Sequence, residues 1–323
     1  MIPESGSTLS SKQKSAQRGR IQGGKGDGMR LLRVKNGAGL EFTVSVDRCA
    51  DISELSLKGD NFCYIGPCGY VSPALYDNKQ AGFMYSFTGG FMTTCGLTAV
   101  GTACVDEGVD IPLHGTVSHS PCENIRHWIE NDEIHIVATV REAALFRDQL
   151  VMERHSVCPL FKNEIYLTDT ITNIGRKQSP FQMMYHCNMG YPLLSENAVL
   201  SMTSKKVEPR DEHAATGIER YHLMEKPQAD FEEMCYNIVM EQNPVVELDN
   251  PDINKGMRMK FDVNELDCFT EWKMMGDYEY VLGLEPGNCT TEGRDVMRKQ
   301  NKLKFIEPGE TKNHHLKFEF FEK

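Results

Sequence analysis

The stretch NIRHWIENDEIHIVATV, residues 124–140, decides the fold class. In its two parts, residues 124–130 and 133–140, apolar and polar residues alternate, as they do in a β-strand with one buried face. The two residues between them, Asn131 and Asp132, favour the tight turn of a two-residue hairpin. The stretch therefore predicts a β-hairpin.

Similar short runs fill the chain from Met29 onward, and Gly, Asn, Asp or Pro interrupts them roughly every 8 to 12 residues. Helical periodicity is sparse, and only short stretches such as residues 229–236 fit a helical turn or two. Because strands and helices do not alternate, we expect an all-β fold, a large antiparallel sandwich, and not a doubly wound sheet. Residues 29–323 contain no linker, which favours a single domain. Further strands are expected at residues 31–35, 40–46, 149–156, 164–172, 256–262, 278–284, 303–306 and 315–320.

The first 28 residues have a different composition. They are rich in Ser, Gly, Gln and Lys and contain no apolar run. Such a segment buries too little surface to offset its ordering entropy, so residues 1–28 are predicted to form a disordered N-terminal arm. Their glycines do not match a phosphate-binding pattern.

Charge and hydropathy exclude several classes of function. The 323 residues include 35 Lys and Arg against 46 Asp and Glu, a net charge of 35 − 46 = −11. Binding to a nucleic-acid backbone requires a surplus of cations, so we expect no nucleic-acid partner. No window has the roughly 18 apolar residues of a membrane span, and the first 30 residues lack a secretory signal. We expect a soluble, cytoplasmic protein without a membrane partner. Formation of a homo-oligomer is compatible with the sequence.

The 11 cysteines are spread along the chain and form no C-x-x-C pair. This spacing is not typical of a zinc site or a redox motif, and reduced, buried thiols are the simplest interpretation. We therefore predict no metal and no cofactor.

Candidate chemistry lies in four polar stretches next to Gly and Pro, where loops on a rigid sheet often carry function. Each also has an ordinary structural interpretation. His114 fits a turn, His186 a buried core histidine, and Arg48 an ion pair. Glu285 ends an apolar strand, where it is either a solvated residue or a buried carboxylate with a functional role. The four stretches are residues 47–52 (DRCADI), 112–116 (PLHGT), 185–192 (YHCNMGYP) and 283–288 (GLEPGN).

The order and spacing of these motifs resemble the aldose 1-epimerase (galactose mutarotase) superfamily, over residues 29–323. The resemblance rests on a Leu-His-Gly turn, a strand-end histidine followed by Asn, and an apolar strand that runs into Leu-Glu-Pro. The stretch from Cys49 to Leu55 is also similar to an early strand of that superfamily. Further motifs resemble an uncharacterised bacterial subgroup of it: Gly89-Gly90-Phe91, Thr94-Cys95-Gly96-Leu97, Pro112-Leu113-His114-Gly115, Asn188-x-Gly190-Tyr191-Pro192-Leu193-Leu194 and Trp272-Lys273-Met274-Met275-Gly276.

The resemblance implies a galactose mutarotase-like β-supersandwich and an isomerase that exchanges the anomers of a monosaccharide or a modified sugar. Ring opening needs a base for the C1 hydroxyl and an acid for the ring oxygen. By resemblance, Glu285 is the base, His186 the acid, and His114 holds the ring oxygen and nearby hydroxyls. A glutamate in this role needs a pKa raised toward neutrality, which partial burial provides.

The sequence departs from the family at two positions. Residues 78–113 contain no arginine where the family has a sugar-binding one, and Arg48 is the expected replacement. The family's aspartate between the second histidine and the glutamate has two candidates here, Asp230 and Glu233. Residues beside the matched motifs are further candidates for binding the substrate, with core packing as the alternative for the tryptophan. They are Asn188, Trp272 and Lys273.

Two other functions use the same fold or the same residues. One is a carbohydrate-binding protein without turnover, which would need no acid and base together. The other is a metal-assisted sugar isomerase, since two histidines and a glutamate can bind a divalent metal. The ligands would come from distant loops, which does not favour that hypothesis. The expected partner in every case is a small-molecule sugar.

Overall fold

The computed structural model describes residues 14–323, and in this part of the chain three large antiparallel sheets carry the fold. The predicted hairpin is confirmed, because residues 124–130 pair with the strand that begins at Glu133. Asn131 and Asp132 form its turn with φ of +51° and +59°, the left-handed conformation that a two-residue turn of this kind requires.

The eight-stranded sheet contains the longest strands, and apolar residues alternate along them toward one face. This alternation buries one side of the sheet and leaves the other in water. Its order is β11 (Asn124–Glu130), β12 (Glu133–Ala143), β13 (Gln149–Pro159), β14 (Glu164–Asn173), β25 (Thr311–Glu322), β21 (Lys255–Phe261), β20 (Val245–Asn250) and β17 (Val199–Met202).

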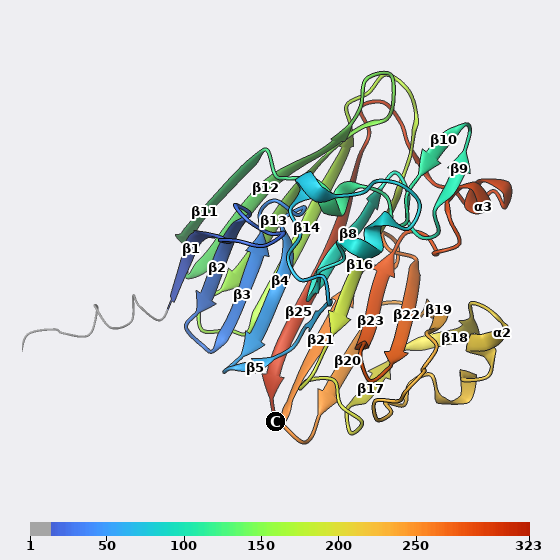
Figure 1. The fold of residues 1–323 in the computed structure, drawn as a ribbon. Helices are drawn as coiled ribbons and strands as arrows, with labels where there is room; N and C mark the ends of the chain where they lie inside the picture. The colour runs from blue at the N-terminus through green and yellow to red at the C-terminus, as the bar shows by residue number, and fades with distance from the viewer. Residues whose placement is uncertain (1–13) are drawn as a thin grey trace, which may run out of the picture.

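Two other sheets cover the buried face of this sheet and lie next to each other, with β4 beside β8 (Figure 1). The five-stranded sheet has the order β1 (Lys14–Arg20), β2 (Arg30–Asn36), β3 (Leu40–Ser45), β4 (Asp51–Leu57) and β5 (Asp60–Asn61). The six-stranded sheet has the order β18 (Ser204–Pro209), β19 (Met234–Met240), β22 (Cys268–Met275), β23 (Tyr280–Gly287), β16 (Gln182–Met189) and β8 (Met92–Leu97). The result is an antiparallel β-supersandwich, as predicted.

Short elements fill the connections. The two-stranded pairs are β6 (Tyr64–Ile65) with β7 (Gly89–Gly90), β9 (Cys104–Asp106) with β10 (Val109–Ile111), and β15 (Ser179–Pro180) with β24 (Phe305–Ile306). The short helices are η1 (Pro73–Leu75), η2 (Gly82–Tyr85), η3 (Val117–His119), α2 (Glu212–Ala215), η4 (Ile218–Arg220) and α3 (Arg294–Lys299). None of the helices between residues 14 and 323 has the length and hydrophobicity needed to cross a bilayer.

Two sequence predictions differ from the structure. Residues 14–28 do not belong to a disordered arm, because β1 pairs along its whole length with β2 and the following turn is hydrogen-bonded. Backbone pairing holds this strand although it has almost no apolar residues. Residues 1–13 lie outside the described part. Residues 229–236 form no helix; β19 begins at Met234 and pairs with β22.

A buried ion cluster connects all three sheets. Arg154 on β13 is 1% exposed and binds Asp169 on β14 through two hydrogen bonds of 2.9 and 2.7 Å. Its other donors reach Asp51 on β4, at 2.8 Å, and Thr94 on β8, at 2.7 Å. Tyr185 on β16 donates its hydroxyl to the same Asp169 at 2.8 Å. One guanidinium thus holds strands of each sheet in a single arrangement around the apolar core.

Removing this guanidinium would leave two buried carboxylates without a counter-charge. We expect Arg154→Ala to lower the free energy of unfolding by about 3 to 5 kcal/mol. Arg141→Ala is the control, because Arg141 makes only an exposed pair with Glu123, and such pairs contribute little. Urea unfolding of both variants measures the difference; equal stability of the two variants would contradict this role of Arg154.

Candidate functional site

The centre of the candidate site is a histidine and a glutamate on neighbouring strands. In the pairing of β16 with β23, Cys187 is opposite Leu284. One residue away in each strand, His186 and Glu285 project together from the other face of the sheet. His186 Nε2 lies 3.2 Å from Glu285 Oε1. The structure therefore brings the predicted acid and base into contact.

Both groups are buried, with exposed fractions of 6% for His186 and 2% for Glu285. Burial raises the pKa of Glu285 well above its usual range, and the negative charge of Glu233 raises it further. Burial lowers the pKa of His186 to about 3, with a further contribution from His114. Both shifts favour the uncharged form of each side chain.

Polar atoms of this pair and of the neighbouring Asn188 are buried without a hydrogen bond. Among residues 14–323, these include Glu285 Oε1, which lies 3.2 Å from His186 Nε2 without forming a hydrogen bond, His186 Nδ1 and Asn188 Oδ1. An unpaired buried polar atom costs about 1 to 3 kcal/mol, so three of them in adjacent positions indicate a place for a polar ligand.

The second predicted histidine, His114, faces His186 from a turn. Its ring centroid lies 5.7 Å from that of His186. The backbone N–H of Gly101 donates to His114 Nδ1 at 3.4 Å, and burial lowers the pKa of the ring to about 4. The neutral ring therefore carries its proton on Nε2. His114 is thus fixed as a hydrogen-bond donor at the edge of the site.

Aromatic rings enclose the histidines. Phe87 and Trp272 have ring centroids 5.2 and 5.3 Å from that of His186. Phe83, on η2, lies 5.1 Å from His114. These rings give the site an apolar wall, which is common in sites for small molecules. Trp272 is therefore part of the site and not of the core between the sheets.

Trp272 also holds a second carboxylate at the rim. Its indole N–H donates to Glu233 Oε2 at 2.7 Å, and the other oxygen of Glu233 accepts from Arg210 at 3.2 Å. Of the two candidates for the family's aspartate position, Glu233 reaches the site. Asp230 is an exposed turn residue with φ of +57°.

Gly283 makes room for this arrangement, because it lies between Trp272 and Asn188 in the pairing of three strands. A Cβ at position 283 would approach Glu285 Oε1 to 2.4 Å and the Trp272 Cβ to 2.9 Å. A glycine inside an apolar strand such as β23 is the sequence feature that could have predicted this close approach of neighbouring side chains.

Asn188 supports the site from within the strand. It is fully buried, and its amide group donates to the carbonyls of His186, at 2.9 Å, and Gly90, at 3.2 Å. These bonds hold the β16 backbone at the histidine, and Asn188 Oδ1 is buried without a hydrogen bond.

Arg48 is placed elsewhere. Its donors bind the carbonyls of Ser118, Val71 and Ser86 and the ring of His119, at distances from 2.7 to 3.1 Å. Arg48 therefore holds together the loops behind His114 and η2 and has no donor directed at the pair.

Lys273 also points away from the site. Its ammonium group binds the carbonyls of Arg220 and Leu223 and the carboxylate of Glu225 at 2.7 to 3.0 Å. Successive residues of a strand face opposite sides, so Lys273 cannot share the site with Trp272.

The sequence analysis missed Phe83, Phe87, Gly283 and Arg210. The two phenylalanines gave no chemical signal, Gly283 indicated only a close approach within its strand, and Arg210 is far from every motif in the sequence. Among residues 14–323, no three His, Cys, Asp or Glu side chains have the arrangement of a metal site, and His114, His186 and Glu285 are no exception. The metal hypothesis thus has no support from geometry.

Comparison with known proteins identifies the family of this chain. A family described as a domain of unknown function (DUF4432) matches residues 26–320. The chain belongs to this family. No curated protein matches the DUF4432 chain.

Several solved structures have the same fold as the DUF4432 chain. A "putative aldose 1-epimerase" from Klebsiella pneumoniae matches with a TM-score of 0.91 and 24% identity, over 95% of this chain and 83% of the other. A galactose mutarotase-like protein from Clostridium acetobutylicum matches with a TM-score of 0.71 and 11% identity, over 97% and 100%. A galactose 1-epimerase from Lactobacillus acidophilus matches with a TM-score of 0.63 and 13% identity, over 96% and 99%. The protein therefore has the predicted galactose mutarotase-like fold.

One further carboxylate lies behind the site. Glu271 faces the core side of β22, is fully buried, and neither of its oxygens has a hydrogen-bond partner in the described part. Burial raises its pKa to about 8, although Lys273 opposes the shift. Glu271 is therefore protonated in the folded protein at neutral pH and ionised in the unfolded chain.

A carboxyl group whose pKa is raised in the folded protein does not change the stability at pH values below its pKa in the unfolded chain, near 4.5. It becomes destabilising as the pH rises from there toward 8. We expect Glu271→Gln to gain stability relative to the wild type over this window, on the order of 1.4 kcal/mol per pKa unit. Urea unfolding at pH 5 and pH 8 tests this. A stability difference that does not change with pH would contradict a protonated Glu271.

Proposed function

We propose that the protein is an isomerase that exchanges the anomers of a neutral sugar by reversible opening of the ring. The observation that carries the proposal is the buried contact between His186 and Glu285 on the same face of the sheet, where Glu285 Oε1 and His186 Nδ1 have no hydrogen bond. The similarity to epimerase structures supports it through the fold, and the mechanism below follows from the contacts of this chain.

The pair supplies both proton transfers of the reaction. Moving the carboxyl proton of Glu285 to His186 gives a carboxylate and an imidazolium without changing the charge of the site. The carboxylate takes the proton of the C1 hydroxyl while the imidazolium protonates the ring oxygen. The bond from C1 to the ring oxygen then breaks and leaves an open-chain aldehyde.

Rotation about the C1–C2 bond presents the other face of the aldehyde. The ring then closes as His186 takes back the proton of the hydroxyl and Glu285 returns its proton to the oxygen on C1. His114 donates from Nε2 to the ring oxygen or to a neighbouring hydroxyl throughout. The site therefore ends each turnover with the protons it had at the start.

The charges around the site favour an uncharged sugar. Arg210 is the cation nearest to Glu233, and Asp211, Glu233 and the thiol of Cys235 already accept its hydrogen bonds at 3.0 to 3.2 Å. Glu233 adds a negative charge close to Glu285. A carboxylate or phosphate on the sugar would meet these carboxylates without a free counter-charge.

The catalytic pair is tested by exchange NMR of the anomeric protons over a panel of aldoses. We expect the wild type to accelerate exchange, and Glu285→Gln and His186→Asn each to slow it by about two to four orders of magnitude. Glu271→Gln is the matched control, because it replaces a buried carboxyl group on the adjacent strand that faces away from the site. Near-normal exchange in Glu285→Gln would show that the base lies elsewhere; sugar binding without any acceleration would favour a carbohydrate-binding protein.

The charge argument has a separate test in the same assay. We expect exchange to be faster for neutral aldoses than for the corresponding uronic acids and 6-phosphates, since charge repulsion acts on binding. Glu233→Gln should reduce the difference in exchange rate between neutral and charged sugars, because it removes one of the repelling charges. A wild-type enzyme that prefers the charged sugars would contradict the assignment of a neutral substrate.

A further inference from the structure

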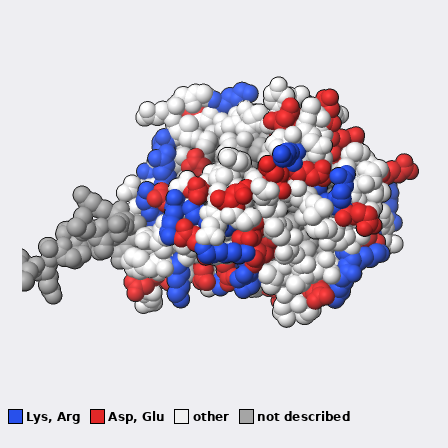
Figure 2. Space-filling model, turned by 90° about the horizontal axis from the view of Figure 1, so that it is seen from below, with Lys and Arg blue, Asp and Glu red and all other residues white. Residues whose placement is uncertain are grey.

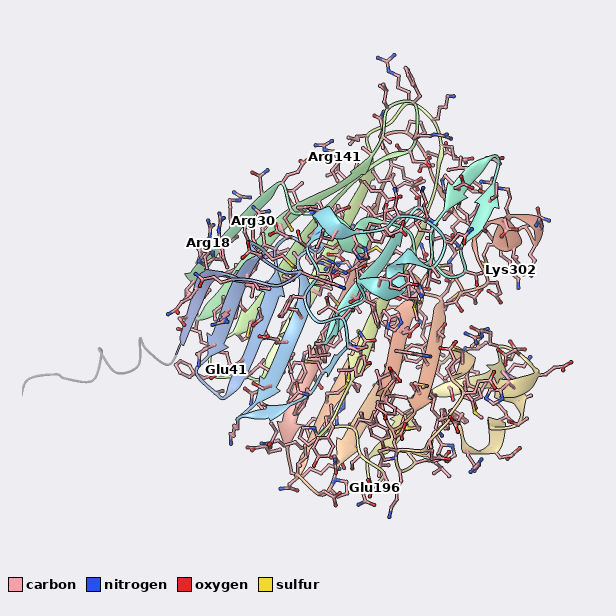
Figure 3. All side chains as sticks on the ribbon, in the orientation of Figure 1. Arg18, Arg30, Glu41, Arg141, Glu196 and Lys302 are labelled. Carbon is pink, nitrogen blue, oxygen red and sulfur yellow. The ribbon has the colours of Figure 1, made fainter. Side chains whose placement is uncertain are left out.

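Three arginines converge on a cleft far from the catalytic pair. The cleft lies where β1 and β2 approach β11, at the opposite end of the molecule from β22 and β23 (Figure 1), and has a volume of about 320 Å³. Arg18 and Arg20 enter it from β1, and Arg30 enters it from β2. Figure 3 places Arg18 and Arg30 beside each other at this edge.

The strand pairing brings like charges together. In the register of β1 with β2, Arg20 is directly opposite Arg30, and Arg18 is two residues farther along the same strand. Like charges directly opposite each other in an antiparallel pair are destabilising. The fold accepts this cost in a protein whose net charge is −11 and whose surface, seen from below in Figure 2, mixes both signs.

Only part of this positive charge is compensated. Asp47 binds Arg30, with hydrogen bonds to the backbone N–H and to Nε at 2.6 and 2.7 Å. Arg18 donates to the carbonyl of Ile125 at 3.1 Å, a neutral acceptor. Arg20 has no hydrogen-bond or ion-pair partner within residues 14–323. Three guanidinium groups therefore share one carboxylate.

The rest of the cleft is built for a small molecule. Its floor is apolar, formed by Leu32 and Val46, each less than 5% exposed. His127 lines the wall, and its Nδ1 is buried without a partner in the described part of the chain. Guanidinium groups above an apolar floor are suited to an anionic oxygen group attached to a less polar body.

We propose that this cleft binds a small phosphate-bearing anion, with Arg18 and Arg20 on the phosphate and the apolar floor under the remainder of the ligand. An anion bound over the paired strands β1 and β2 neutralises the opposed arginines and so stabilises the pairing. The site is separate from the sugar site and does not depend on the proposed isomerase activity.

Calorimetric titration with inorganic phosphate and with phenyl phosphate, at constant ionic strength, tests the proposal. We expect saturable binding at one site per chain, and at least tenfold weaker binding to Arg20→Gln. Arg33→Gln is the matched control: it removes the same charge from an exposed position of β2 outside the cleft. Tighter binding of phenyl phosphate supports an ester ligand that uses the apolar floor, and equal affinities support free phosphate as the ligand.

The thermal midpoint gives a second readout. Without phosphate, Arg20→Gln should melt no lower than the wild type, because the substitution relieves repulsion between opposed charges. Phosphate should raise the midpoint of the wild type and of Arg33→Gln but not that of Arg20→Gln. No saturable binding of either compound to the wild type, or an equal loss in both variants, would overturn the proposal.

Discussion

The buried guanidinium of Arg154 is the interaction on which the rest of the structure depends. Burying three charged groups carries a desolvation penalty, which hydrogen bonds of good geometry offset. Here those bonds come from three sheets, so the charges are satisfied only when the sheets are correctly placed. Two of the partners, Thr94 and Tyr185, are immediate neighbours of residues on the site face. The ion cluster in the core therefore also fixes the position of His186 on the other side of β16.

Strand alternation divides the six-stranded sheet into a chemical face and a structural face. His186, Glu285 and Trp272 lie on the first, and the residues next to them, such as Tyr185 and Glu271, lie on the second. The chemical face is itself covered by loops and aromatic rings, which explains why β16 and most of β23 are buried on both sides. Burial of that face shifts the pKa values of His186 and Glu285 in opposite directions, in each case toward the uncharged form.

Much of the fold could be predicted from the sequence, because the eight-stranded sheet alternates in burial and its hairpin has a characteristic turn. β16 could not be recognised in this way: the run QMMYHCNM is buried on both faces and has no alternation. β1 was missed for the opposite reason, since its pairing uses backbone groups and its side chains are mostly polar. The convergence of His114, His186 and Glu285 followed only from the family resemblance, because the residues lie far apart in the chain. Arg48 was misplaced because its carbonyl partners come from distant loops, whereas Lys273 could have been excluded by its position next to Trp272.

The central claim is that a sugar lies across His186 and Glu285, and a crystal structure of the Glu285→Gln variant with an accelerated neutral aldose would test it most directly. The account predicts the C1 hydroxyl within about 2.6 to 3.2 Å of the side chain at position 285, and the ring oxygen within the same distance of His186 or His114. A sugar bound with its C1 and ring oxygen away from these side chains, or bound only at another place, would contradict it.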